Sequence, residues 1–304
     1  MPETGDLSLS KKGSIRKKIV INARGRRLVL GERTMVMGVV NLTPDSFSGD
    51  GRLLRARDPV FHCDFAIRLV NEGADIIDLG GESTRPRAAS VSVTEEIKRV
   101  VPVITLLRKR TNAFISVDTS KIEVARRALD AGADIVNNVM GLNLSKAFLK
   151  TIKDYDAALV VMHMRGTPRT MQSKTKYKSV VVDILDELFT SLEKCLDSGI
   201  KSDKIIIDPG IGFAKTVEQN LLILKDLKKF KVLKRPILVG TSRKSFIGKI
   251  LSADVGDRLW GTAATVAAGI LNGAHIIRVH DVKAMKQVAV LTDAILNPSM
   301  AQKL

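Results

Sequence analysis

Short apolar runs alternate with longer amphipathic segments along most of the chain. The clearest run opens the stretch MVMGVVNLTPDSFSGDG at residues 35–51. Its first six residues are apolar and β-branched enough for a buried strand, and a polar loop begins at Asn41. The same pattern recurs and predicts eight strands: Met35–Val40, Asp75–Leu79, Ala113–Val117, Asp134–Asn137, Ala157–Met162, Lys204–Ile207, Pro236–Val239 and Ala274–Val279.

The segments between these runs have apolar residues at helical spacing. Repeated alternation of strand and helix indicates a parallel sheet, and eight units in about 250 residues predict a (β/α)₈ TIM barrel. A doubly wound open sheet is the alternative, but the G-x-G-x-x-G fingerprint that usually follows its first strand is absent. The predicted helices are Pro59–Gly73, Val93–Arg110, Ile122–Ala131, Ser145–Tyr155, Val180–Ser198, Val217–Phe230, the segments after Ser245 and Gly261, and Val282–Leu296.

Glycines mark the ends of several predicted helices, and a hairpin is expected before the first unit. Gly73, Gly132, Gly199 and Gly273 stand where helix C-caps are expected. The β-prone runs Ile19–Asn22 and Arg27–Leu30 predict an N-terminal β-hairpin. We expect residues 1–16 to form a basic tail. Residues 17–300 then form a single barrel domain, since no linker interrupts the series.

Composition narrows the class of protein. The 304 residues are 45% hydrophobic, which argues for a large core, and no apolar run approaches the length of about 20 residues that spans a bilayer. The N-terminus lacks the apolar segment of a secretory signal, and two cysteines are too few for a disulfide framework. We therefore expect a cytoplasmic protein that binds no membrane.

The net charge of +17 raises the question of nucleic acid. Aromatic residues are only 4% of the chain, so platforms for base stacking are scarce, and the basic residues are scattered. Solvated helix faces and loops explain this charge better. Part of it can also serve an anionic small-molecule substrate, and we expect no nucleic-acid partner.

Every predicted strand is followed by polar residues, and in a barrel these residues share one mouth. Acceptor groups suit a flat heterocycle with several N–H donors, such as a pterin or a purine. They are Asp118, Asn137 and Asp208. Donor groups suit an anion. They are Arg85, Ser242, Lys244, Arg278 and His280. Asp118 and Ser242 also have the residue types of helix N-caps, but that role does not explain eight polar strand ends at once.

Any metal site is expected to have few protein ligands. Asn41 is a suitable single protein ligand for Mg²⁺ whose other ligands are waters and phosphate oxygens. Asp45 and Asp50 are better explained as turn residues. No His/Cys cluster for zinc is present in the sequence. His163 and His275 are expected to be packed or to support the site indirectly, whereas alternation places His280 beside Arg278.

Seven motifs resemble those of the dihydropteroate synthase family. They are GVVNLTPDSFS, GGESTRP, SVDTSK, MHMRGTPRTMQ, DPGIGFAK, SRKSFIG and IIRVHDV, spread in order over most of residues 35–290. The resemblance implies a (β/α)₈ barrel and a transferase of folate biosynthesis. Such enzymes join 6-hydroxymethyl-7,8-dihydropterin pyrophosphate to 4-aminobenzoate, releasing pyrophosphate and 7,8-dihydropteroate. The resemblance also implies Mg²⁺ as cofactor and a homodimer formed through C-terminal helices. Residues 258–272 are a candidate for such an interface helix.

The resemblance implies roles for named residues, carried over by position in the motifs. Those expected to hold the pterin are Asp118, Asn137, Met162, Asp208 and Lys244. Those expected on the aminobenzoate side are Thr84, Arg85, Pro86, Phe213 and Ser242. Arg278 and His280 are expected to bind pyrophosphate, and Asn41 to bind Mg²⁺ together with it. Lys244, Arg278 and His280 are the implied catalytic residues.

Three local departures concern the second substrate more than the pterin. Arg87 replaces a usual glycine, Asp50 is displaced by one position, and Asn138 stands where an aspartate is usual. We therefore expect the arylamine acceptor to be 4-aminobenzoate or a modified arylamine. Two other enzyme classes fit the sequence less well. A pterin-to-corrinoid methyltransferase needs no anion clamp, and a hydrolase with a protein-bound metal pair needs additional His ligands.

Overall fold

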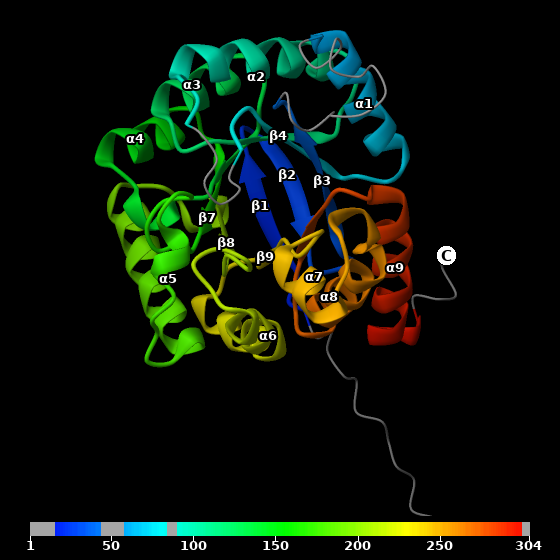
Figure 1. Ribbon diagram of the computed structural model, residues 1–304. Helices are drawn as coiled ribbons and strands as arrows, with labels where there is room; N and C mark the ends of the chain where they lie inside the picture. The colour runs from blue at the N-terminus through cyan, green and yellow to red at the C-terminus, as the bar shows by residue number, and fades with distance from the viewer. Residues whose placement is uncertain (1–15, 44–57, 84–89, 300–304) are drawn as a thin grey trace, which may run out of the picture.

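The computed structural model describes residues 16–43, 58–83 and 90–299. Eight parallel strands form a barrel, as predicted (Figure 1). Neighbouring strands pair in chain order, β10 pairs with β3, and the bridge between Ile207 and Ile237 joins β8 to β9. The strands are β3 (Met35–Asn41), β4 (Ile76–Gly80), β5 (Phe114–Asp118), β6 (Ile135–Asn138), β7 (Ala158–Met162), β8 (Ile205–Asp208), β9 (Leu238–Val239) and β10 (Ile276–Val279).

Helices surround this barrel (Figure 1). They are α1 (Pro59–Asn71), α2 (Val93–Arg108), α3 (Ile122–Asp130), α4 (Lys146–Asp154), α5 (Val180–Asp197), α6 (Val217–Lys225), α7 (Ser245–Leu251), α8 (Leu259–Leu271) and α9 (Val282–Leu296). Their apolar faces pack on the outward side chains of the strands and form the larger core cluster. No helix in the described ranges is long and apolar enough to cross a membrane.

One predicted helix ends earlier than expected. The sequence predicted a helix over Val217–Phe230, but α6 ends at Lys225 and a 3₁₀ helix, η6 (Leu227–Leu233), follows. The buried residues of η6 are Leu227, Phe230 and Leu233. Their spacing of three aligns them on one face of a 3₁₀ helix, which has three residues per turn. Tertiary packing of this face therefore overrides the α-helical pattern.

The predicted glycine caps are confirmed, and Gly73 shows why glycine is needed. Its φ of +105° is left-handed, and its N–H donates to the Val70 carbonyl at 2.9 Å. The next N–H, of Ala74, reaches back to the Leu69 carbonyl at 2.9 Å. This pair of bonds is a Schellman motif, which turns the chain from α1 directly into β4.

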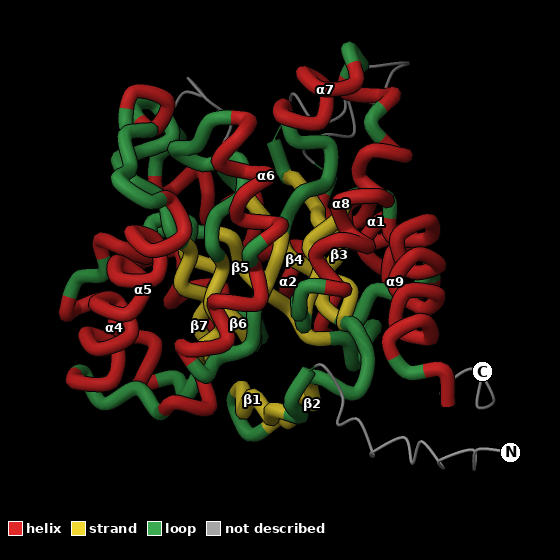
Figure 2. The backbone as a smooth tube through the Cα atoms, turned by 90° about the horizontal axis from the view of Figure 1, so that it is seen from below, coloured by secondary structure: helices red, strands yellow, loops and turns green. Residues whose placement is uncertain are grey.

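The N-terminal hairpin covers one end of the barrel, as Figure 2 shows from below. Strands β1 (Ile19–Ala23) and β2 (Arg26–Leu30) pair antiparallel around Arg24 and Gly25, both at positive φ. Their apolar side chains join the cluster that fills the barrel interior, with Met37 and Ile206 among its members. Arg16, just before the hairpin, forms a buried ion pair with Asp293 of α9. The strands' C-terminal ends are therefore the end left to carry a site.

Candidate active site at the C-terminal end of the barrel

The centre of the candidate site is Arg278 of β10. Its Nε donates to Asp78 Oδ2 at 2.6 Å, and its Nη2 donates to Asp118 Oδ2 at 2.9 Å. Asn137 Nδ2 also donates to Asp78 Oδ2, at 3.1 Å. Asp78 Oδ1 and Asp118 Oδ1 are buried and accept no hydrogen bond from the described residues. Three neighbouring strands and β10 thus bring together one cation and several acceptors, with acceptor capacity left for a ligand that donates N–H groups.

Asp208 and the loop after it form a second wall. Asp208 ends β8, and its Oδ1 accepts the Gly210 N–H at 2.7 Å. Phe213 follows on the same loop, and Lys244 Nζ lies 3.8 Å from the centre of its ring. A Cβ on Gly212 would lie 2.9 Å from Lys244 Cδ, so glycine allows this close approach. The loop therefore holds a carboxylate, an aromatic face and an ammonium group together.

Ser242 fixes the orientation of His280. The Ser242 hydroxyl accepts the His280 backbone N–H at 3.2 Å and lies 3.0 Å from His280 Nδ1. The hydroxyl has one proton and two lone pairs, so it donates to Nδ1 in the tautomer that carries the ring hydrogen on Nε2, and accepts from Nδ1 in the other. Burial and the nearby Arg278 lower the pKa of His280 to about 3, so the ring is neutral at pH 7. In the tautomer with the hydrogen on Nε2, His280 presents an N–H donor to the site.

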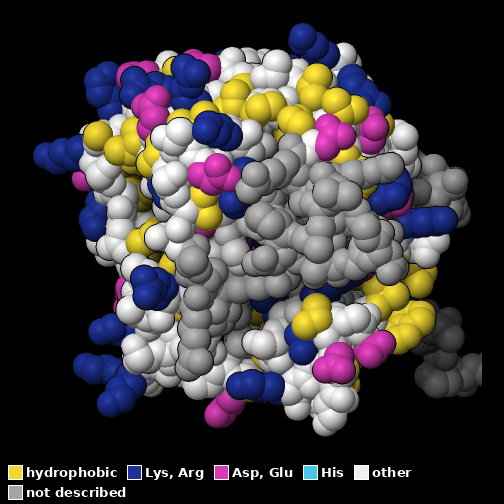
Figure 3. Space-filling view, turned by 45° about the horizontal axis from the view of Figure 1, so that its top comes forward, with side chains coloured by type: hydrophobic (Ala, Val, Ile, Leu, Met, Phe, Trp, Pro, Cys, Tyr) yellow, Lys and Arg dark blue, Asp and Glu magenta, His cyan; other side chains and the backbone are white. Residues whose placement is uncertain are grey.

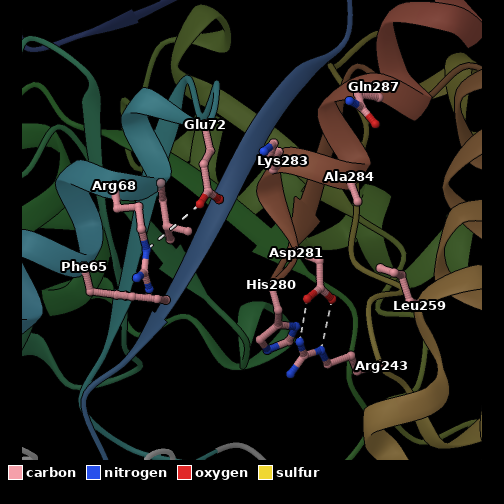
Figure 4. A pocket seen from close by; sticks show the side chains of 11 residues that line it. Phe65, Arg68, Glu72, Arg243, Leu259, His280, Asp281, Lys283, Ala284 and Gln287 are labelled. Atoms are coloured by element: carbon pink, nitrogen blue, oxygen red, sulfur yellow. Dashed lines mark hydrogen bonds and ion pairs between the residues drawn. The ribbon is translucent and has the colours of Figure 1, made fainter.

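A pocket of about 540 Å³ lies beside His280, between α1 and α9. Figure 4 shows Arg243 facing Asp281 on one side, with oxygen–nitrogen distances of 2.5 and 3.0 Å. Arg68 of α1 and Glu72, which caps that helix, face them across the pocket. Two basic groups that line this pocket are therefore already paired, Arg243 with Asp281 and Arg68 with Glu72. Lys and Arg are dispersed over the face seen in Figure 3, with acidic and apolar side chains between them.

Burial shifts the titration of the central groups. It raises the pKa of Asp118 to about 7, although Arg278 opposes this shift, and it raises the pKa of Asp208 to about 6, opposed first by the Gly210 N–H. Burial, then Arg278, lowers the pKa of Lys244 to about 8. For Arg278 burial opposes the charge, but Asp78 and Asp118 together raise its pKa. Perturbed groups gathered in one place are typical of an active site.

The donor set near Asn41 fits a magnesium ion. A Cβ on Gly80 would lie 3.9 Å from Asn41 Oδ1 and 4.0 Å from Asp118 Oδ2, so this glycine leaves space beside both oxygens. Among the described residues no group of three His, Cys, Asp or Glu side chains is arranged to hold a metal. One amide oxygen supplemented by waters and phosphate oxygens is a set that Mg²⁺ accepts.

Several sequence predictions lie outside the described residues: Asp45, Asp50, Thr84, Arg85, Pro86 and Arg87. Met162 ends β7 and packs in one apolar cluster with Phe213. His163 is buried behind the site, and His275 lies just before β10, where its Nδ1 accepts the Ile237 N–H at 3.1 Å. The side chain of Asn138 caps a local turn by accepting the Met140 N–H at 2.8 Å.

Sequence reasoning missed two buried charged residues near this end of the barrel. Asp78 is fully buried and contacts both Arg278 and Asn137. Its signal was a carboxylate within the otherwise apolar strand IIDLG. Lys215 is 5% exposed and ends the motif DPGIGFAK, but nothing in its spacing distinguished it from solvated lysines.

Comparisons with known proteins agree with this geometry. A family model described as pterin binding enzyme matches residues 37–280. The dihydropteroate synthase of Synechocystis sp. is 46% identical over 266 residues, 87% of this chain and 91% of that protein. Xanthomonas albilineans dihydropteroate synthase, solved with 4-aminobenzoic acid, has a TM-score of 0.84 and 36% identity, covering 92% of this chain and 99% of that one. The Clostridium difficile enzyme, solved in the presence of pteroic acid, has a TM-score of 0.80 and 44% identity, covering 88% and 98%. The chain therefore belongs to the pterin-binding enzyme family and, within it, to the dihydropteroate synthases.

Proposed function

We propose that this transferase condenses 6-hydroxymethyl-7,8-dihydropterin pyrophosphate with 4-aminobenzoate, giving 7,8-dihydropteroate and pyrophosphate. The observation that carries the proposal is the juxtaposition at one barrel mouth of buried acceptors with Arg278 and His280. Acceptors match the N–H groups of a pterin, and donors match a pyrophosphate. Relatives solved with 4-aminobenzoic acid and with pteroic acid support both halves of the reaction.

The pterin edge is assigned to Asp118, Asn137 and Asp208. Asn137 donates one N–H to Asp78, which leaves its amide oxygen as an acceptor for the ligand. Asp208 offers Oδ2, since Oδ1 already accepts the Gly210 N–H. Carboxylates that bind the amino-pyrimidine edge also stabilise the positive charge that develops on the ring. Met162 and Phe213 supply apolar surface for the ring itself.

The reaction begins when the exocyclic CH₂–O bond breaks and its electron pair leaves with the pyrophosphate. Arg278 and the Nε2–H of His280 bind the departing oxygens, and Lys244 adds positive charge nearby. Asn41 is the proposed protein ligand for Mg²⁺, which would supply positive charge to stabilise the departing pyrophosphate. The neutral amine of 4-aminobenzoate then attacks the methylene cation and releases a proton to water. No covalent nucleophile is required.

The aminobenzoate side is assigned to Phe213 and Ser242, together with Thr84, Arg85 and Pro86, which lie outside the described residues. Ser242 lies against His280, so the second substrate approaches next to the leaving-group donors. This arrangement brings the amine close to the breaking bond, and holding two reactants in that geometry accelerates the reaction.

We also propose a homodimer and a cytoplasmic location. Large apolar side chains are exposed on α8 and α9: Trp260 is 80% exposed, Leu291 65% and Ile295 63%. The two helices pack on one another, so these residues lie on adjoining elements. Light scattering coupled to gel filtration is expected to give the mass of a dimer, and that of a monomer for Trp260→Glu. A wild-type monomer would contradict the dimer.

The function is tested by pyrophosphate release from the pterin pyrophosphate with Mg²⁺, with and without 4-aminobenzoate. Release that requires 4-aminobenzoate, with dihydropteroate as product, is the expected result. Pterin binding without that product would support the pterin site but indicate that the enzyme uses another acceptor in place of 4-aminobenzoate. Release from neither mixture, with no pterin binding, would refute the function.

A further inference from the structure

A buried lysine behind the candidate site organises the loop that follows β8. Lys215 is 5% exposed, and its Nζ lies 2.9 Å from the Gly210 carbonyl oxygen, 2.8 Å from that of Phe213 and 3.1 Å from His163 Nδ1. The loop around it has positive φ at Gly210, Gly212 and Ala214. A Cβ on Gly210 would lie 1.9 Å from the His163 carbonyl oxygen. The loop is thus wound tightly around one side chain.

The contacts fix the protonation of this cluster. His163 Nε2 lies 3.0 Å from Glu187 Oε2, and an ionised carboxylate can only accept, so Nε2 carries the ring hydrogen. In a neutral ring Nδ1 is then an acceptor, so Lys215 Nζ donates to Nδ1 and to two carbonyls, which takes the three hydrogens of an ammonium ion. Burial, then the Lys215 charge, lowers the pKa of His163 to about 4, in agreement with a neutral ring.

Two carboxylates act electrostatically on the charge of Lys215. Glu187 of α5 balances it through His163, and Asp208 of β8 faces it from the site. Burial lowers the pKa of Lys215 to about 7, while Asp208 and Glu187 oppose this shift. Conversely, Lys215 helps to lower the pKa of Asp208. The groups that face Lys215 are Asp208 from β8, His163 and Arg165 from the β7–α5 segment, Glu187 from α5 and Lys244 from the β9–α7 segment.

The same loop supplies the pterin pocket of the proposed function. Its first residue is Asp208, and Phe213, whose carbonyl accepts from Lys215, holds its ring 3.8 Å from Lys244 Nζ. Removing the ammonium group would leave two buried carbonyls without a donor and Asp208 with less positive charge nearby. Both effects act on the pocket, although Lys215 itself donates to two backbone carbonyls and to His163, and not to an assigned ligand-binding side chain.

We propose that Lys215 is a positioning residue for pterin recognition: its buried ammonium, supported through His163 by Glu187, fixes the β8–α6 loop that carries Asp208 and Phe213. The inference rests on the proposed function and adds a residue to it. It predicts a specific defect in pterin binding and in the pH dependence of that binding. A merely structural lysine would affect only stability.

The test compares Lys215→Met with Lys204→Met, using fluorescence titration with 6-hydroxymethylpterin from about pH 5 to about pH 9. Lys204 is a matched control, because it is also 5% exposed and its Nζ contacts Asp156 Oδ1 at 2.7 Å and the Asn22 carbonyl at 3.1 Å, beside the hairpin. Lys215→Met is expected to weaken pterin binding by about tenfold or more at neutral pH. It should also move the acid limit of binding to higher pH. Lys204→Met should lower thermal stability and change neither.

Wild-type pterin affinity and acid limit in folded Lys215→Met would overturn the inference, while wild-type enzyme that binds no pterin would instead overturn the proposed function. Glu187→Gln provides a second test if Lys215→Met does not fold. It removes the charge that favours the ammonium form of Lys215 but keeps an acceptor for His163. A neutral amine has two hydrogens for three acceptors, so pterin binding should weaken on the alkaline side at lower pH than in wild type. An unchanged alkaline limit would also overturn the inference.

Discussion

The ion pair between Asp78 and Arg278 allows a test of the site that does not depend on activity. Asp78 is fully buried, with Arg278 Nε 2.6 Å and Asn137 Nδ2 3.1 Å from its Oδ2. Removing one partner of a buried pair costs about 3–5 kcal/mol, because the other charge stays buried. Asp78→Asn keeps an acceptor oxygen, so we expect a loss of about 3 kcal/mol. Arg278→Met leaves two carboxylates without their cation, and we expect about 4 kcal/mol.

The two changes should not add. Once Arg278 is absent, Asp78→Asn removes an unpaired carboxylate instead of a paired one, so the double variant should lose about 4–5 kcal/mol in total. The implied coupling is about 2–3 kcal/mol. Urea unfolding of the four proteins measures it from the midpoints at constant slope. Asp78→Asn combined with Lys204→Met, at the other end of the barrel, is the additive control. Additive losses for Asp78 and Arg278 would refute the view that they form one energetic unit.

Three further outcomes are expected. Asp208→Asn should fold with cooperative unfolding but lose pterin binding; a purified variant with wild-type affinity would remove Asp208 from the site. Because the folded-state pKa of Asp208 is raised to about 6 and that of Lys244 is lowered to about 8, pterin affinity should fall as pH drops below the first value or rises above the second. An affinity constant over both limits would contradict these roles. Gly210→Ala should destabilise the fold by about 3 kcal/mol or more, since its Cβ would meet the His163 carbonyl oxygen, whereas Gly25→Ala, with positive φ but open space, should cost about 1 kcal/mol; equal losses in urea unfolding would exclude the steric explanation.

Local sequence accounts for most of the barrel. A buried parallel strand is a short apolar run, and each predicted run became one strand with ends shifted by at most two residues. Gly73 was recognisable because a helix that turns at once into a strand needs a left-handed residue. The acceptors Asp118, Asn137 and Asp208 were recognisable because chemistry follows the strands' C-terminal ends in this fold. These are patterns between near neighbours in sequence, and the resemblance of the motifs added the reaction.

Only the tertiary structure decided how these groups pair. Arg278 was expected to bind an anion and Asp118 a heterocycle, yet barrel closure places them 2.9 Å apart, across 160 positions of sequence. Asp78 reads as part of an apolar strand, and Lys215 as one of many basic residues, until the fold shows which carboxylate faces the interior and which lysine the loop encloses. Periodicity fixes which residues share a face of one element. The stagger and closure of eight strands determine which faces pack together. Burial then strengthens the electrostatic interactions between their charged groups enough to organise the site.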